Sequence, residues 1–157
     1  MKILAIFFFV LLLFIFPQKL HSPETETINV FFYEVSNQGE DILSSYSITI
    51  PYWLNTQQRA FIVFNEIFNN FDPDKMIYAP PNVQVLDVFF HPYEAHLILN
   101  VSDEILNYGG THFEYRLVNK LLKNAGNIPG VGYFTVLIEG RREHLPEGIK
   151  IHEIRVY

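Results

Sequence analysis

The 157-residue sequence contains no cysteine, which excludes disulfides, thiolate metal ligands, thiol nucleophiles and lipid attachment at an N-terminal cysteine. Basic residues are also few. Without Lys2 and Lys19, which flank an apolar N-terminal run, 9 basic residues remain against 17 acidic ones, a formal charge of −8. Such a surface repels a phosphate backbone, and no cluster of Lys and Arg with interleaved aromatics interrupts it, so we expect no nucleic-acid partner.

The N-terminal run, residues 3–16, is the longest uninterrupted apolar stretch. As a helix it would span about 21 Å, short of the ~30 Å hydrocarbon core, so its length is typical of an export signal. No pair of small residues follows it to serve as a cleavage site, which favours an uncleaved anchor. We therefore predict a signal peptide or signal anchor over residues 1–21, a tether over 22–27 and one domain over 28–157. The domain would be extracytoplasmic and held at the cell membrane, or secreted if the signal is cut.

Hydrophobic periodicity predicts an α+β domain. Alternating or β-branched segments indicate strands at residues 28–35, 46–50, 83–90, 96–101, 131–138 and 149–156. One helix is expected from a cap at Asn55 or Thr56 to about Asn69, with Ala60, Phe61, Phe64, Ile67 and Phe68 as its apolar stripe. A second helix begins at a capping Thr111 and stops near Asn124 and Gly126. This order predicts a single domain in which two helices pack on one side of a mostly antiparallel sheet.

Two histidines flank the turn between the strands at 83–90 and 96–101. His91 and His96 would face one another on the paired strands with Glu94 between them, which is a candidate two-histidine and one-carboxylate metal site. No third ligand at a fixed spacing accompanies them, and a hairpin end carries such residues without binding a metal. A metal-assisted hydrolase on these three residues is therefore the least favoured function.

A second candidate is the glycine pair Gly109 and Gly110 before a helix. The free N–H groups of a helix start, together with His112, would attract a small anion, although every helix has such a start and few bind anions. Tyr52 and Trp53, which are adjacent in the sequence, are aromatics that a glycan could contact. Together with the helix start at Gly109 and Gly110, they make a ligand-binding module for cell-wall glycan or a small anion the main alternative function. The sequence has no G-x-S-x-G motif and no phosphate loop between strand and helix, so we expect neither an enzyme nor a cofactor.

The second half of the chain carries an ordered series of short motifs. A proline-led strand, a hairpin and a strand end occupy residues 81–86 and 100–102, a glycine-containing helix entry follows at Gly109 and Gly110, and a P-G-V turn leads into a final strand over residues 129–140. The residues that carry these motifs are Pro81, Asn100, Ser102, Gly109, Gly110, Pro129, Gly130 and Gly140. In their order and spacing the motifs resemble the GerMN domain family of sporulation and spore-germination proteins, and the resemblance extends over about residues 28–157.

The resemblance implies a non-catalytic, extracytoplasmic module similar to the ring-building modules of sporulation assemblies. Its expected partners are other envelope proteins, including further copies of this chain, and the membrane through residues 3–16. Three features depart from the family: the cysteine for lipid attachment is missing, one domain copy stands where the family includes tandem pairs, and Asn100 replaces a common Asp. Without that cysteine, we expect the apolar N-terminal segment, and not a lipid, to hold the domain at the membrane.

Overall fold

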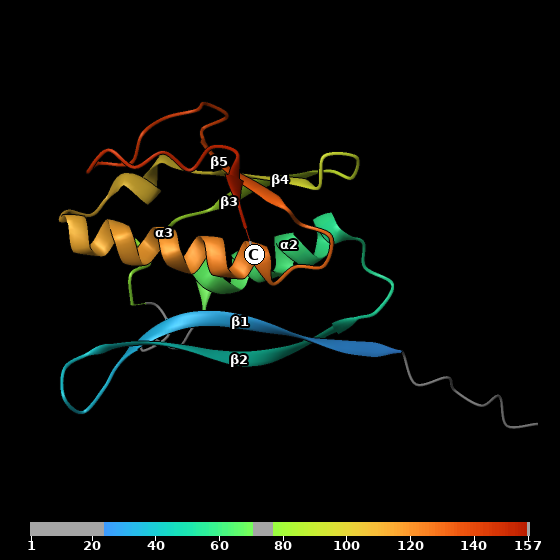
Figure 1. Ribbon diagram of the computed structural model, residues 1–157, viewed down its shortest axis with the longest axis horizontal. Coiled ribbons are helices and arrows are strands. Elements are labelled where there is room, and N and C mark those ends of the chain that lie inside the picture. The colour runs from blue at the N-terminus through green and yellow to red at the C-terminus, as the bar shows by residue number, and fades with distance from the viewer. Residues whose placement is uncertain (1–23, 71–76, 157) are drawn as a thin grey trace, which may run out of the picture.

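The computed structural model describes residues 24–70 and 77–156, and Figure 1 shows their arrangement. In these two ranges, two α-helices, α2 and α3, and a 3-10 turn, η2, join six strands. The strands are β1 (Thr25–Val35), β2 (Asp41–Pro51), β3 (Val85–His91), β4 (His96–Val101), β5 (Tyr133–Ile138) and β6 (Ile154–Arg155). The helical elements are α2 (Thr56–Asn69), η2 (Asp103–Leu106) and α3 (Thr111–Gly126).

The strands form two sheets with the helices between them (Figure 1). Strands β1 and β2 make an antiparallel hairpin on one side, and β3-β4-β5-β6 make a four-stranded sheet on the other. The α+β class, the single domain and the mainly antiparallel pairing are confirmed. The expectation of one sheet differs from the structure, because the first hairpin packs on the opposite face of the helices and its outer edge meets side chains of α3 instead of a strand.

One strand pair is parallel. Strand β5 runs alongside β4 in the same direction, with His96 opposite Tyr133 and Val101 opposite Ile138. The connection between them contains η2 and α3, and a crossover of this length returns the chain to the end where β4 began. The predicted last strand over 149–156 is reduced to two residues, because Glu153 adopts a positive φ of 51° and interrupts the extended backbone.

The helix prediction holds for α2 and needs one correction for α3. In α2, Asn55 Oδ1 accepts the Gln58 N–H and Gln58 Oε1 accepts the Asn55 N–H, which is a complete capping box. In α3 the N-cap is Gly110 and not Thr111, because the cap has a φ of 96°, which glycine adopts without strain. Thr111 is the first helical residue.

The hydrophobic core fills the space between the helices and both sheets, and buried residues of both hairpin strands belong to it. Phe64 of α2 stacks on Phe134 of β5 with ring centroids 5.4 Å apart, and the α3 stripe of Leu117, Leu121 and Ala125 is fully buried. Phe61, which the predicted α2 stripe included, is instead 46% exposed. The Phe61 ring therefore lies at the protein surface.

The N-terminal predictions lie largely outside the described residues. The apolar run at 3–16 and the signal segment over 1–21 fall there, and the predicted tether over 22–27 ends at Glu24 because β1 begins at Thr25. Within residues 24–70 and 77–156, no helix combines the length and the apolar character needed to cross a bilayer.

Candidate docking surface

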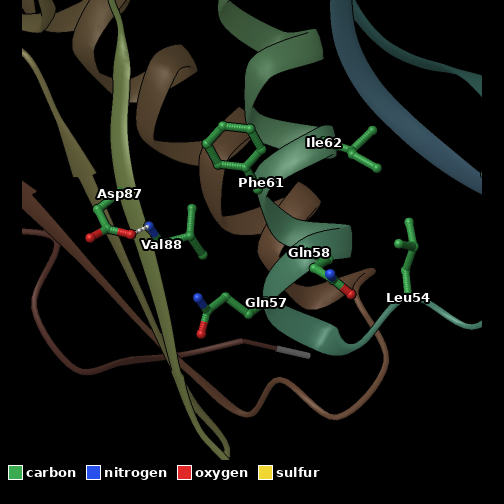
Figure 2. Close-up of a pocket in the computed structure, with 7 residues that line it drawn as sticks. All are labelled: Leu54, Gln57, Gln58, Phe61, Ile62, Asp87 and Val88. Atoms are coloured by element: carbon green, nitrogen blue, oxygen red, sulfur yellow. Dashed lines mark hydrogen bonds between the residues drawn. The ribbon is translucent and has the colours of Figure 1, made fainter.

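A shallow groove of about 310 Å³ lies between α2 and β3 (Figure 2). Its lining is mostly apolar or uncharged and consists of Leu54, Gln57, Gln58, Phe61, Ile62, Asp87 and Val88. Figure 2 places Gln57 and Phe61 on the side of α2 that faces Asp87 and Val88 of β3. Asp87 contributes the one charged group of this lining.

The groove borders the edge of the four-stranded sheet, because β3 is the outermost strand. A bulge between Val85 and Asp87 disturbs the pairing with β4, and the side chains of Leu86 and Phe89 are exposed. Asp87 Oδ1 accepts the Val88 N–H at 2.7 Å, so this backbone donor of the edge strand is satisfied within the chain. The surface therefore offers apolar side chains more than a free backbone edge.

The predicted metal residues come together only in part. His91 and His96 are register partners, as expected, with ring centroids 6.4 Å apart, and Glu94 lies in the turn between them. In the part of the chain that the structure describes, no three His, Asp or Glu side chains are arranged to hold a metal ion. His96 instead places Nε2 at 2.9 Å from the Thr135 hydroxyl, and its burial lowers its pKa.

The predicted anion site at the start of α3 already holds a carboxylate of the same chain. Glu147 Oε1 accepts the Gly110 N–H at 2.9 Å and Glu147 Oε2 lies 3.4 Å from the Thr111 hydroxyl. A carboxylate at this position interacts favourably with the helix dipole. The glycine pair therefore forms a helix start that is occupied by the Glu147 carboxylate of the same chain. This occupancy weakens the hypothesis that the site binds a small anion.

The buried side chain of Glu114 adds to the contact between α3 and the segment around Glu147. Its carboxylate accepts hydrogen bonds from the Tyr108 hydroxyl at 2.9 Å and from the backbone N–H groups of Glu147 at 2.6 Å and Ile149 at 2.8 Å. These bonds fasten the segment after β5 to the first turns of α3. Sequence reasoning did not single out Glu114, because a glutamate early in a helix is ordinary.

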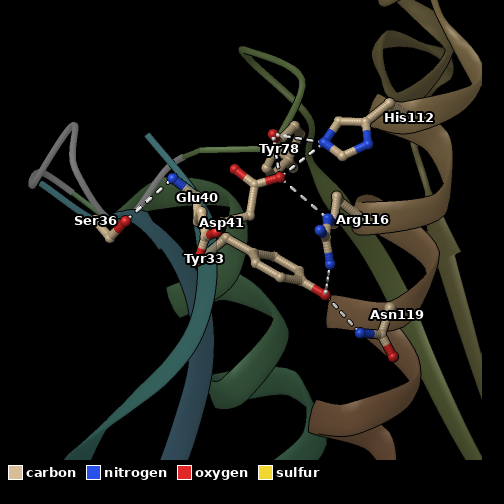
Figure 3. A network of polar contacts seen from close by, with 8 residues as sticks. All are labelled: Tyr33, Ser36, Glu40, Asp41, Tyr78, His112, Arg116 and Asn119. Carbon is tan, nitrogen blue, oxygen red and sulfur yellow. Dashed lines mark hydrogen bonds and ion pairs between the residues drawn. The ribbon is translucent and has the colours of Figure 1, made fainter. Parts of the chain in front are cut away.

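His112, the other residue proposed for anion binding, joins a network between the hairpin and α3 (Figure 3). Asp41 Oδ2 accepts hydrogen bonds from the Tyr78 hydroxyl at 2.9 Å, His112 Nε2 at 2.7 Å and Arg116 Nε at 3.1 Å. The bond from Tyr78, followed by those from His112 and the Arg116 charge, holds the pKa of Asp41 below its ordinary value. Asp41 is not among the candidate residues that the sequence suggested.

The aromatic pair of the glycan hypothesis is exposed but not flat. Tyr52 is 50% and Trp53 61% exposed, and their rings meet edge to face with an interplanar angle of 87°. Perpendicular rings do not make a shared platform for a sugar. The pair is nevertheless an exposed aromatic surface that the core does not use.

Several residues of the family-like motif stabilise turns. Asn100 Oδ1 accepts the Gly140 N–H at 2.8 Å, and an Asp at this position would offer the same acceptor, which explains why the exchange is tolerable. Ser102 Oγ accepts the Gln84 N–H at 2.9 Å, and the Pro129 carbonyl lies 3.3 Å from the Thr56 hydroxyl. Pro81 and Gly109 are exposed.

Comparison with solved structures shows that the fold is that of a GerMN domain. The tandem GerMN domains of the sporulation protein GerM from Bacillus subtilis match with a TM-score of 0.60 and 14% identity, over 82% of this chain and 45% of that chain. The first GerMN domain of the same protein matches with a TM-score of 0.58 and 14% identity, over 82% of this chain and 96% of that one. This chain therefore spans less than half of the tandem pair and nearly all of one domain.

No protein-family model matches the sequence, and no curated protein matches it. The resemblance to the GerMN family predicted from residues 81–140 is confirmed at the level of the fold.

Proposed function

We propose that this protein is a non-catalytic interaction and assembly module in the extracytoplasmic envelope of a spore-forming bacterium, with a role in sporulation or spore germination. The observation that carries the proposal is the GerMN-like fold, which corresponds to 96% of the first GerMN domain of a sporulation protein. Among the described residues, His96 of the candidate metal site contacts Thr135, and the helix start considered for anion binding holds Glu147. This leaves surface contact as the function that the geometry supports best.

The groove between α2 and β3 is the surface on which we place a partner envelope protein. Leu54, Phe61, Ile62 and Val88 would receive an apolar side chain, and the Asp87 carboxylate would pair with an adjacent Lys or Arg of the partner. The domain's formal charge of −8 attracts a basic partner at long range and repels an acidic one. The occupant is thus an apolar residue flanked by positive charge.

Membrane attachment is the other part of the proposal. The apolar run at residues 3–16 would direct export and hold the domain at the outer face of the cell membrane, and cleavage after it would release the domain. In either case the domain would act outside the cytoplasm.

Site-specific photo-crosslinking in sporulating cells tests the docking surface. A photoreactive phenylalanine analogue replaces Phe61 in the groove, and in the control it replaces Tyr115, which is 59% exposed on α3. We expect an adduct with one membrane or envelope protein, identified by mass spectrometry, from position 61 but not from position 115. Asp87→Lys, which reverses the charge in the groove, should abolish that adduct.

Two results would count against the proposal. One is an adduct pattern that is the same at positions 61 and 115, or absent at both. The other is a deletion strain that forms spores and germinates like its parent, combined with a 22–157 fragment that remains strictly monomeric and captures no envelope protein.

A further inference from the structure

Exposed aromatic side chains gather at one end of the molecule's long axis. Figure 1 shows the β2–α2 connection, the β3–β4 turn and the α3–β5 connection at the end where β1 begins. These segments carry Tyr52 and Trp53, the fully exposed Tyr93, and Tyr133, which is 42% exposed. The Ala95 carbonyl accepts the N–H groups of Gly132 and Tyr133 at 2.7 and 3.0 Å, which joins two of the three segments. We call these four aromatics the aromatic end.

The chain enters the domain at the same place. The carbonyl of Glu24 accepts the Tyr52 N–H at 3.2 Å, so the first described residue lies directly beside the Tyr52–Trp53 turn. Seven residues, 17–23, separate Glu24 from the apolar run at 3–16, so eight residue steps join Glu24 to the end of that run. An extended chain covers at most about 3.6 Å per residue, or about 29 Å in all. A membrane that holds the apolar run therefore lies within about 29 Å of the aromatic end.

The chemistry of the aromatic end suits the headgroup region of a bilayer. Trp and Tyr are enriched there, because each combines an apolar ring with a polar N–H or O–H. Glu24, Glu94 and Glu153 are exposed among these aromatics, and their charge keeps the contact at headgroup depth and out of the hydrocarbon. Glu26 is paired with Arg59 at 2.6 Å, so it adds little repulsion. Because the domain is acidic, a zwitterionic lipid surface suits it better than an anionic one.

We propose that the aromatic end rests on the membrane that holds residues 3–16, with Trp53 and Tyr93 among the lipid headgroups. This contact sets the long axis of the domain upright on the bilayer, so that the start of α3 points away from the membrane (Figure 1). The inference rests on the membrane attachment in the proposed function, and it adds a second contact that orients the domain.

The single tryptophan of the chain makes the contact measurable. Trp53 is the only Trp in the sequence, so the intrinsic fluorescence of the full-length protein reports on this position alone. The protein is reconstituted into phosphatidylcholine vesicles with and without bromine on the acyl chains. We expect the Trp53 emission to shift to shorter wavelength relative to the protein in detergent-free buffer, and brominated lipid to quench part of it, since the ring lies at headgroup depth just above the acyl chains.

The matched control moves the probe to the opposite end of the long axis. In the Trp53→Phe/Tyr115→Trp double variant both exchanged side chains are exposed aromatics, so the fold should be retained, as circular dichroism would check. Position 115 lies in the second turn of α3, far from the aromatic end. We expect its emission to remain unquenched by brominated lipid and accessible to acrylamide in the water.

The outcomes separate this inference from the proposed function. If the protein floats with the vesicles but Trp53 is not quenched, the aromatic contact is refuted and the anchor at residues 3–16 stands. Equal quenching at positions 53 and 115 also refutes an upright orientation. If the protein does not float with the vesicles, both the anchor and the aromatic contact are refuted, while the crosslinking at position 61 still tests the docking surface.

Discussion

The side chain of Asn124 should decide whether the first hairpin stays on the domain. Asn124 is fully buried in α3, and its amide faces the outer edge of β1. Oδ1 accepts the Phe31 N–H and Nδ2 donates to the Phe31 carbonyl, both at 2.9 Å. The amide thus makes the two bonds that a neighbouring strand would have made. A third bond, from Asn127 Nδ2 to the Asn29 carbonyl at 2.7 Å, lies further along the same edge.

Replacing Asn124 by alanine leaves one donor and one acceptor of Phe31 without partners. An unsatisfied buried polar group costs about 1–3 kcal/mol, and Phe31 is half-buried, so water relieves part of the cost. We expect Asn124→Ala to lower the free energy of unfolding by about 2–4 kcal/mol. For a domain of this size that corresponds to a fall in Tm of roughly 8–16 °C.

Urea unfolding and thermal denaturation of the 22–157 fragment, followed by circular dichroism, measure the effect. Asn127→Ala serves as the control, because it removes a single bond at a half-exposed site and should cost about 1 kcal/mol. Hydrogen exchange of the Phe31 amide should accelerate in Asn124→Ala more than exchange in β4 or β5, since the hairpin edge opens first.

A third variant, Asn124→Asp, tests the donor alone. Its carboxylate still accepts the Phe31 N–H, but the negative charge lies against the Phe31 carbonyl oxygen, so the variant should be less stable than the parent at neutral pH. Its stability should increase as the pH falls, because the carboxyl group then binds a proton and can donate to the carbonyl. The reasoning fails if Asn124→Ala is within 1 kcal/mol of the parent, or if Asn127→Ala costs as much.

Three further predictions concern buried or networked charges. Glu114→Gln places an amide NH₂ against the backbone donors of Glu147 and Ile149, so it should cost about 1–3 kcal/mol and speed hydrogen exchange at the Ile149 amide; unchanged exchange would contradict this. Burial lowers the pKa of Lys120 from 10.5 to about 7, so between these pH values the unfolded chain binds more protons than the folded one. The free energy of unfolding should therefore rise by about 1.4 kcal/mol per pH unit as the pH increases through that range. Urea titrations of Lys120→Met should lack this slope, and an identical slope in both proteins would refute the assignment. Because the pKa of Asp41 is lowered in the folded protein, its network stabilises the fold above the ordinary pKa of 3.8, and this contribution is lost as the pH falls further. Asp41→Asn should therefore be less stable than the parent at pH 7, and the difference between their free energies of unfolding should close in acid. A gap independent of pH would assign the effect to packing.

Local patterns predicted the secondary structure well where a short-range rule applies. The capping box at Asn55 and Gln58 and the four- and three-residue spacing of Ala60, Phe64 and Ile67 depend on residues within one or two turns. The turn between His91 and His96 was likewise recognisable, and the two residues are register partners as predicted. Each of these features is decided by neighbours in the sequence, so the sequence is enough to find it.

Long-range contacts account for what the sequence did not reveal. The helix end predicted near Asn124 and Gly126 is confirmed, but nothing in the local pattern shows that the Asn124 amide binds Phe31, 93 positions away. Thr111 was expected to cap α3, but Glu147 supplies the acceptor for Gly110 from 37 positions downstream. Phe61 belongs to the helical stripe by spacing and still lies in a surface groove, because α2 meets only the edge of the sheet there.

The sequence alone determined a one-domain α+β protein without thiol chemistry, with an acidic surface and an apolar N-terminal run, since composition and periodicity carry these properties directly. Only the tertiary structure decided that the first hairpin forms its own sheet, that β5 joins β4 in parallel, and that the exposed aromatics share the end where the chain enters the domain. The physical reason is that hydrogen-bond partners and burial depend on which segments fold next to each other, and residues about 90 positions apart leave no periodic signal of their pairing.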